Sequence, residues 1–107
     1  MVGNWNTQKK IIEDEIIVIM KKNYDGYRII DNINFGMKRS EMIFYRNESK
    51  RNIEFIFEYN RTVKMIIRES NKETSSIKAF KFSEIDNIKK ETISLIKKIK
   101  IMDIFNN

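Results

Sequence analysis

Cysteine, histidine and proline are all absent from this chain of 107 residues. Without cysteine, the chain has no disulfide and no thiolate ligand for a metal ion. Without histidine, it lacks the commonest zinc ligand and the side chain that most often serves as a general base. Without proline, no helix or strand is interrupted by that residue. These absences remove thiolate metal sites, the commonest zinc ligand and the usual general base, and no other catalytic or metal-binding motif rises above chance, so we expect no cofactor and no metal site.

Long apolar segments are lacking as well. No window approaches the roughly 18–20 apolar residues that a helix needs to span a bilayer. Residues 1–5 lack the charged and apolar regions of a secretory signal peptide. We therefore expect a cytoplasmic protein that has no membrane partner. The chain length predicts a single domain over residues 1–107, large enough to bury a core without disulfides.

Positive charge is in excess, with a formal net charge of +6 at pH 7. Such an excess is typical of proteins that bind nucleic acids or anionic surfaces. A second explanation is that lysine, asparagine and isoleucine use codons rich in A and T, so an AT-rich genome raises the lysine content of any protein. Arginine, which makes the better bidentate contacts with phosphate and guanine, supplies only six of the 21 basic residues. The charge alone therefore does not decide the function.

Residues 7–22 are predicted to form a helix because their apolar side chains recur at intervals of three and four. The predicted apolar face consists of Trp5, Ile12, Ile16, Ile19 and Met20. Asn6 or Thr7 is a suitable N-cap. The β-branched run 16–20 would also suit a buried strand. The polar stretch 8–15 before it is too long for the margin of a strand, which favours the helix.

Farther along the chain, apolar and polar residues alternate, as is typical of strands with one buried face. The predicted strands span residues 27–35, 41–46, 53–59, 63–68 and 77–82. Asp31 falls on the apolar face of the first strand, so we expect that strand at an edge of the sheet, or Asp31 beside a partner.

A long second helix is predicted to follow, with Ser83 and Asp86 as a capping box at its start. Its apolar stripe comprises Ile85, Ile88, Thr92, Leu95, Ile96 and Ile99. The elements together predict an α+β fold. We expect a two-layer sandwich in which an antiparallel meander of four to five strands carries the N-terminal and C-terminal helices on one face.

Residues 53–68 form a predicted hairpin whose pairing follows from matching its apolar side chains. A three-residue loop over 60–62, with Asn60 in the left-handed conformation, keeps the apolar sets of both strands on one face. The resulting inward pairs are Tyr59 with Val63, Phe57 with Met65, and Phe55 with Ile67. The outward pairs are Glu58 with Lys64, Ile56 with Ile66, and Glu54 with Arg68. The two opposite-charge pairs each add roughly 0.2–1 kcal/mol of stability.

The outward face of the sheet is the first candidate for a functional surface. Neighbouring strands are expected to align Ile43, Ile56 and Ile66 in a row, which Tyr45 and Ile30 extend. A contiguous apolar patch on a sheet often marks a partner surface. We therefore expect a small non-enzymatic binding protein, of the antagonist, immunity or mobile-element accessory type, which contacts another protein or a second copy of itself. The predicted protein interface consists of Ile43, Tyr45, Ile56 and Ile66.

The alternative is a nucleic-acid-binding accessory protein that holds phosphates with its basic loops. The candidate residues are Lys38, Arg39, Lys50, Arg51 and Arg61. In a meander, Lys38, Arg39 and Arg61 lie at one end of the sheet, and Lys50 and Arg51 at the other. The sheet face itself is disfavoured because its predicted cations are paired with glutamates and its aromatic residues mostly face the core.

A histidine-free ribonuclease toxin is a third hypothesis, and the least favoured. The residues that would converge on the open sheet face are Tyr45, Arg46, Glu54 and Arg68. Glu48-Ser49-Lys50, with Asp31 upstream, matches the Asp…Glu-x-Lys pattern of metal-dependent nucleases. This pattern falls in a predicted loop and is frequent by chance in a charge-rich chain. We therefore expect no enzymatic activity.

Overall fold

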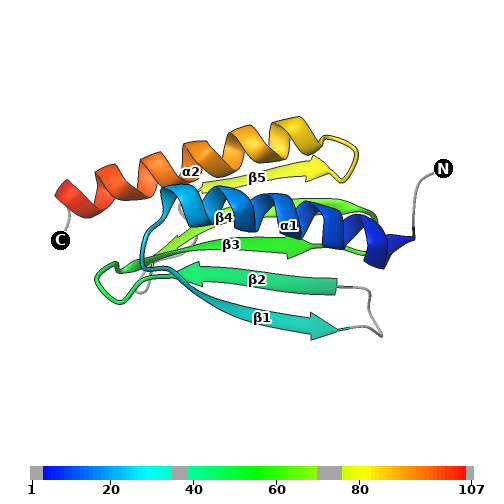
Figure 1. Cartoon of the computed structure of the whole chain (residues 1–107), viewed down its shortest axis with the longest axis horizontal. Coiled ribbons are helices and arrows are strands. Elements are labelled where there is room, and N and C mark those ends of the chain that lie inside the picture. The colour runs from blue at the N-terminus through cyan, green and yellow to red at the C-terminus, as the bar shows by residue number, and fades with distance from the viewer. Residues whose placement is uncertain (1–3, 35–38, 70–75, 106–107) are drawn as a thin grey trace.

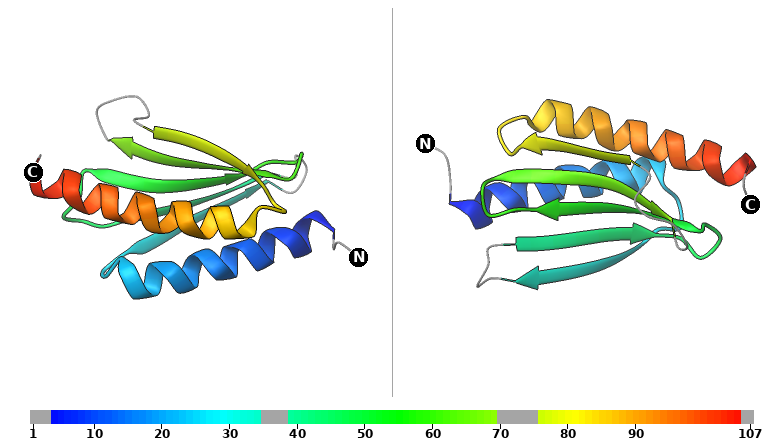
Figure 2. Two further views of the ribbon diagram at one scale, coloured as in Figure 1. Left: turned by 90° about the horizontal axis from the view of Figure 1, so that it is seen from above. Right: turned by 180° about the vertical axis from the view of Figure 1, so that it is seen from behind.

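The computed structural model describes residues 4–34, 39–69 and 76–105, and in them the chain forms two helices and five strands. The elements in chain order are α1 (Trp5–Asn23), β1 (Arg28–Asn34), β2 (Arg39–Tyr45), β3 (Arg51–Phe57), β4 (Thr62–Glu69), β5 (Ser76–Lys81) and α2 (Ile85–Phe105). The strands form one antiparallel sheet in the order β1-β2-β3-β4-β5 (Figure 1). Both helices lie on the same face of this sheet (Figure 2). The predicted α+β sandwich is confirmed, with five strands in the meander.

α1 begins at Trp5, earlier than predicted. Asn4 is its N-cap, since Asn4 Oδ1 accepts a hydrogen bond of 2.8 Å from the Thr7 amide. The predicted caps, Asn6 and Thr7, lie within the first turn instead. The β-branched run 16–20 continues the helix, so the strand alternative is wrong.

The core lies between the helices and the sheet. Its largest fully buried side chains are Tyr24, Phe44, Phe55, Phe57, Ile16, Met20, Met42, Ile53, Met65, Ile67, Ile88 and Leu95. Phe44 and Phe55 pack edge to face, with ring centroids 5.6 Å apart. The indole N–H of Trp5 donates a 2.7 Å hydrogen bond to the Glu58 carbonyl, which ties the start of α1 to the loop after β3. We call the sheet face opposite the helices the outer face.

α2 begins at Ile85, and the predicted capping box of Ser83 and Asp86 is wrong by one residue. Glu84 precedes the helix, and its carbonyl accepts the first intrahelical hydrogen bond, of 3.0 Å. The Glu84 carboxylate accepts a 2.7 Å hydrogen bond from the Lys81 amide. This bond closes the turn after β5, and the carbonyl bond places Glu84, not Ser83, at the start of the helix. The predicted apolar stripe is confirmed, with Ile88, Thr92, Leu95, Ile96 and Ile99 buried and Ile85 partly buried.

β1 and β5 are the two edge strands of the sheet. Asp31 lies on the helix-facing side of β1 and is exposed to solvent. This confirms the prediction that the carboxylate requires a strand at the edge. An inward-pointing charge on an edge strand also opposes pairing with a strand of another sheet.

The hairpin of β3 and β4 has a different register from the predicted one. The observed pairs are Phe57 with Val63, Phe55 with Met65, and Ile53 with Ile67. The loop consists of residues 59–61 instead of 60–62. Each residue of β3 therefore pairs with a residue of β4 that lies two positions earlier than predicted. Tyr59, predicted to face the core, lies in this loop and is 70% exposed. A shift by two residues leaves the strand side chains on their predicted faces, since those faces alternate with a period of two.

Arg61 ends the hairpin loop with a backbone φ of +63°. Its amide donates to the Glu58 carbonyl at 3.1 Å, and the Glu58 amide donates to the Thr62 carbonyl at 2.8 Å. This is the pattern of a turn followed by a left-handed residue. The prediction that Asn60 takes the left-handed conformation is therefore wrong. Both predicted charge pairs still form, as diagonal neighbours, between Lys64 and Glu58 at 3.2 Å and between Arg68 and Glu54 at 2.7 Å.

Replacing Arg61 with glycine is expected to raise the free energy of unfolding by about 0.5–1 kcal/mol. A side chain at positive φ costs roughly 1–2 kcal/mol, and glycine removes that cost while it adds entropy to the unfolded chain. Denaturant unfolding followed by the fluorescence of Trp5, the sole tryptophan, measures the change. Asn60→Gly is the control in the same loop, and it gains nothing because Asn60 lacks a positive φ. An Arg61→Gly protein no more stable than the parent would contradict the prediction.

Candidate functional site

The outer face of the sheet carries a row of side chains that crosses all five strands. The strand registers align Ile30, Ile43, Glu54, Ile66 and Ile77, and we call these residues the outer row. Neither α1 nor α2 lies on this face (Figure 2). Glu54, on the central strand, is 6% exposed, and its Oε2 lies 2.7 Å from Arg68 Nε. The outer row therefore consists of two apolar halves on either side of an ion pair.

The four predicted interface residues all belong to the outer face, but they do not form one row. Ile43 and Ile66 are members of the outer row, whereas Ile56 lies in the next row, between two charged residues. The predicted alignment is wrong because it requires Ile56 opposite Ile66. The two-residue shift of the hairpin removes that pairing.

The predicted interface residues also differ in exposure. Their exposure is partial for Ile43 and Tyr45, and only 7% and 4% for Ile56 and Ile66. The most exposed members of the outer row lie on the edge strands, Ile30 at 44% and Ile77 at 61%. Apolar contact is therefore available mainly at the two ends of the row.

Most charged side chains of the outer face are joined in ion pairs. The pairs are Arg39 with Glu41, Lys64 with Glu58, and Arg68 with Glu54. Arg28 on β1 and Lys81 on β5 belong to the same face by register. Neither of these two forms an ion pair with any residue that the structure describes. Counting the described residues alone, the outer face therefore has a cation without an ion-pair partner near each of its edges.

The residues predicted to bind nucleic acid differ in their availability. Arg39 and Arg61 lie at one end of the sheet and Lys50 and Arg51 at the other, as predicted, while Lys38 lies outside the described residues. Arg51 belongs to β3, not to the preceding loop, and it is 6% exposed because it points toward the helix layer. Arg39, Lys50 and Arg61 are exposed, but Arg39 is paired with Glu41, which leaves Lys50 and Arg61. The nucleic-acid hypothesis stays a prediction, which depends chiefly on these two side chains.

The residues suggested for a ribonuclease do not share one face. Tyr45, Glu54 and Arg68 belong to the outer face by register. Arg46 turns instead toward the helix layer, where it contacts Tyr24 at the end of α1. The four side chains therefore do not converge as that hypothesis requires.

The nuclease-like segment Glu48-Ser49-Lys50 lies in the loop between β2 and β3, whereas Asp31 lies on the edge strand β1. Within residues 4–34, 39–69 and 76–105, no three Asp, Glu, His or Cys side chains are grouped as a metal ion requires. The sequence pattern is thus not matched by a cluster of carboxylates in this part of the chain.

A second polar site lies on the helix side, where α2 approaches the loop between β2 and β3. Asp103 is 6% exposed, and its Oδ1 accepts hydrogen bonds from Ser49 Oγ at 2.9 Å and from Arg51 Nη1 at 3.1 Å. Arg51 Nε also lies 3.4 Å from Glu69 Oε1. We call Ser49, Arg51, Glu69 and Asp103 the Asp103 cluster. It ties the end of α2 to β3, to β4 and to the loop.

The sequence does not predict the Asp103 cluster, because Ser49 and Asp103 are 54 positions apart. The position of Asp103 on α2 is the one feature of the sequence that indicates it. Asp103 follows Ile99 by four positions, so it continues the apolar stripe of α2. A carboxylate in such a position indicates a buried partner, because an unpaired buried charge is very costly.

Arg46 lies beside the Asp103 cluster and stacks on Tyr24, with its Cζ 4.8 Å from the ring centroid. Tyr24 is fully buried, and its hydroxyl has no hydrogen-bond partner in the described part of the chain. Burial raises the pKa of Tyr24 to about 12, against the opposing effect of the Arg46 charge. The hydroxyl therefore stays protonated at neutral pH.

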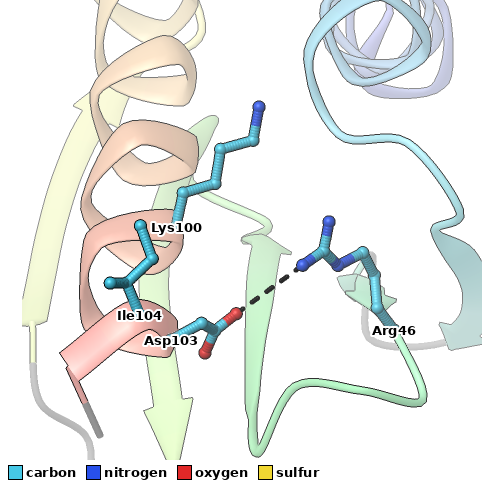
Figure 3. A pocket seen from close by; sticks show the side chains of 4 residues that line it. All are labelled: Arg46, Lys100, Asp103 and Ile104. Atoms are coloured by element: carbon cyan, nitrogen blue, oxygen red, sulfur yellow. Dashed lines mark ion pairs between the residues drawn. The ribbon is translucent and has the colours of Figure 1, made fainter. Parts of the chain in front are cut away.

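Two cavities lie at opposite ends of the sheet. The first has a volume of about 380 Å³ and is lined by Arg46, Lys100, Asp103 and Ile104 (Figure 3). The second has a volume of about 440 Å³ and is lined by Gln8, Asn60, Arg61, Thr62, Lys81, Phe82 and Ser83. Both contain cations, and the first also contains the buried carboxylate of Asp103.

The chain matches no protein-family model, no curated protein and no solved structure. Among the helices that the structure describes, none is long and apolar enough to cross a membrane. The function has to be inferred from the outer face and from the sites on the helix side.

Proposed function

We propose that this protein is a non-enzymatic binding protein that docks an acidic partner protein on the outer face of its sheet. The outer row carries this proposal, since its apolar side chains cross the sheet on a face that neither helix covers. Ile30 and Ile77, at the two ends of the row, are 44% and 61% exposed. Apolar side chains flanked by charged ones are typical of protein-binding surfaces.

The charges of the outer face indicate the kind of partner. Its glutamates, Glu41, Glu54 and Glu58, are each already paired with a cation of the chain. Arg28 and Lys81, near the two edges, form no ion pair with any residue in the described ranges. A partner that surrounds an apolar patch with carboxylates would pair with both, and such complementarity raises the association rate and excludes wrong partners.

A second copy of the chain fits this face less well. Two copies each carry a net charge of +6 and therefore repel each other. Among the residues that the structure places on it, the outer face has more cations than anions, so two such faces lack complementary charge. Asp31 opposes the pairing of two β1 edges. We therefore assign the face to a partner of different sequence.

Ile77→Glu is expected to weaken binding of the partner at least about ten-fold, because it places a charge at the most exposed point of the outer row. The matched control is Ile11→Glu, which makes the same change at an isoleucine of α1 that is 56% exposed. The immobilised protein captures candidates from a lysate of its natural host cells. The affinity of each purified candidate is then measured for wild type, Ile77→Glu and Ile11→Glu at low and high salt.

Support requires an acidic protein whose binding falls with salt and with Ile77→Glu, but changes less than about two-fold with Ile11→Glu. Equal effects of the two variants would overturn the proposal, as would the failure of every captured protein to bind once purified. Sedimentation of the wild-type protein alone tests whether a second copy of the chain binds the outer face. A dimer that Ile77→Glu abolishes would assign the face to a second copy and overturn the acidic partner.

A further inference from the structure

The cavity beside the Asp103 cluster differs from the outer face in place and in chemistry. It lies on the helix side, between the last turns of α2 and Arg46 (Figure 3). Two cations, Arg46 and Lys100, line it together with the carboxylate of Asp103 and the apolar side chain of Ile104. Its volume of about 380 Å³ lies at the small end of the range for ligand sites, which is roughly 300–1,000 Å³. The site is shallow and largely open to solvent, so it suits a small molecule with one charged group.

The Arg46 guanidinium makes only long polar contacts with the described part of its own chain. Its side chain is only 17% exposed, yet its contacts are 3.4 Å to the Asp25 carbonyl, 3.7 Å to Glu48 Oε1 and 3.8 Å to Asp103 Oδ2. Charge-assisted hydrogen bonds of a guanidinium normally measure about 2.7–2.9 Å. The Arg46 Nε atom is buried and has no hydrogen-bond partner in the described part of the chain. The two Nη atoms, whose contacts of 3.4 and 3.8 Å are long, are the donors left to receive an anion.

Asp103 and Lys100 supply the other two groups. The Asp103 side chain is 9% exposed, and its Oδ2 atom accepts no hydrogen bond from any described residue. Its Oδ1 atom is held by Ser49 and Arg51, so the Asp103 charge is already partly compensated. Lys100 is exposed and forms no ion pair with the residues that the structure describes. The cavity thus offers two cations for an anion and one buried oxygen that can accept a hydrogen bond.

We propose that this cavity binds a small phosphorylated molecule that carries a hydroxyl group close to its phosphate. The phosphate contacts Arg46 and Lys100, because a guanidinium and an ammonium are the usual phosphate ligands among side chains. The hydroxyl donates to Asp103 Oδ2, which is buried in this structure, so the Arg46 guanidinium 3.8 Å away moves aside when the ligand enters. A phosphate without a hydroxyl meets the carboxylate as a repelling charge and makes no hydrogen bond to it, so Asp103 selects for hydroxylated ligands. The carbon chain packs against Ile104.

Isothermal titration calorimetry at low salt tests the site with glycerol 3-phosphate and with propyl phosphate, which has the same carbon skeleton without hydroxyl groups. Glycerol 3-phosphate is expected to bind at least about ten-fold more tightly than propyl phosphate, the size of discrimination that one charge-assisted hydrogen bond provides. Lys100→Gln is expected to weaken glycerol 3-phosphate binding about ten-fold. Lys98→Gln is the matched control, since Lys98 is an exposed lysine of the same helix that does not line the cavity.

Three results would overturn the proposal. One is the absence of any heat of binding with glycerol 3-phosphate. Another is equal binding of propyl phosphate, which removes the role of Asp103. The third is an equal loss of affinity for glycerol 3-phosphate in Lys100→Gln and Lys98→Gln, which would show that the general positive charge of the chain causes the binding. None of these results bears on the outer face, so this site and the proposed protein-binding function fail or hold independently.

Discussion

Replacing Arg51 with methionine is expected to lower the free energy of unfolding by about 3–5 kcal/mol. The Arg51 and Asp103 side chains are 8% and 9% exposed, and Arg51 Nη1 lies 3.1 Å from Asp103 Oδ1. Without Arg51, Asp103 keeps Ser49 at hydrogen-bond distance and Arg46 only at 3.8 Å. The cost arises because a buried carboxylate then lacks its close counter-charge. A loss of this size is a large share of the roughly 5–15 kcal/mol that stabilises a typical domain.

Urea unfolding of the Arg51→Met protein measures this loss. Trp5 is the sole tryptophan and is 5% exposed, so its fluorescence reports the exposure of the core. Lys50→Met is the matched control, since Lys50 is the exposed neighbour in the sequence, and it is expected to change stability by less than about 0.5 kcal/mol. Adding Asp103→Leu to Arg51→Met removes the stranded carboxylate and is expected to restore part of the stability. A loss below about 1 kcal/mol for Arg51→Met alone would show that the Asp103 cluster is not a buried ion-pair network.

Phe55→Ala is expected to destabilise the protein by a similar amount, about 3–5 kcal/mol. Phe55 lies on the central strand β3 and is 0% exposed. Its ring meets that of Phe44 at an interplanar angle of 85°. Alanine removes this contact and leaves a cavity between the sheet and the helices, where close packing prevents full collapse.

The same unfolding experiment, with two reference variants, tests the Phe55 prediction. Phe55→Leu retains most of the buried volume and is expected to cost less than about half as much as Phe55→Ala. Tyr59→Ala removes an aromatic ring that is 70% exposed in the loop after β3, and it is expected to cost less than about 0.5 kcal/mol. Equal costs for Phe55→Ala and Tyr59→Ala would contradict the placement of Phe55 in the core.

The sequence identifies the faces of the strands more reliably than their pairing. Alternation places Phe55, Phe57 and Met65 toward the helices, and all three are fully buried. The same alternation cannot distinguish registers that differ by two residues, because each puts the same side chains inside. The turn decides between them, and here Arg61 takes the left-handed position that Asn60 suits better by type.

The ends of the helices show a similar limit. The apolar stripes of α1 and α2 follow from spacing alone, and both are confirmed. Their caps do not follow, since several capping residues are available within one turn at each start. Asn4 and Glu84 take these positions in the structure, where Trp5 bonds the Glu58 carbonyl and the Glu84 carboxylate bonds the Lys81 amide.

The candidate sites depend still more on contacts between distant residues. The sequence assigns Ile56 and Ile66 to the outer face, but their low exposure, 7% and 4%, does not follow from the alternation of the strands. It identifies Arg51 as basic, but its burial depends on Asp103, 52 positions away. The cavity beside Arg46 likewise exists only where α2 meets the loop after β2.

For this protein, local periodicity therefore determined the order of the elements, the inward faces and the two-layer α+β architecture. These features depend on neighbours within a few residues, which a sequence displays directly. The tertiary structure alone decided the hairpin register, the outer row, the Asp103 cluster and the cavity with Arg46 and Lys100. Each of these depends on which distant side chains meet, and that follows from the packing of the whole core.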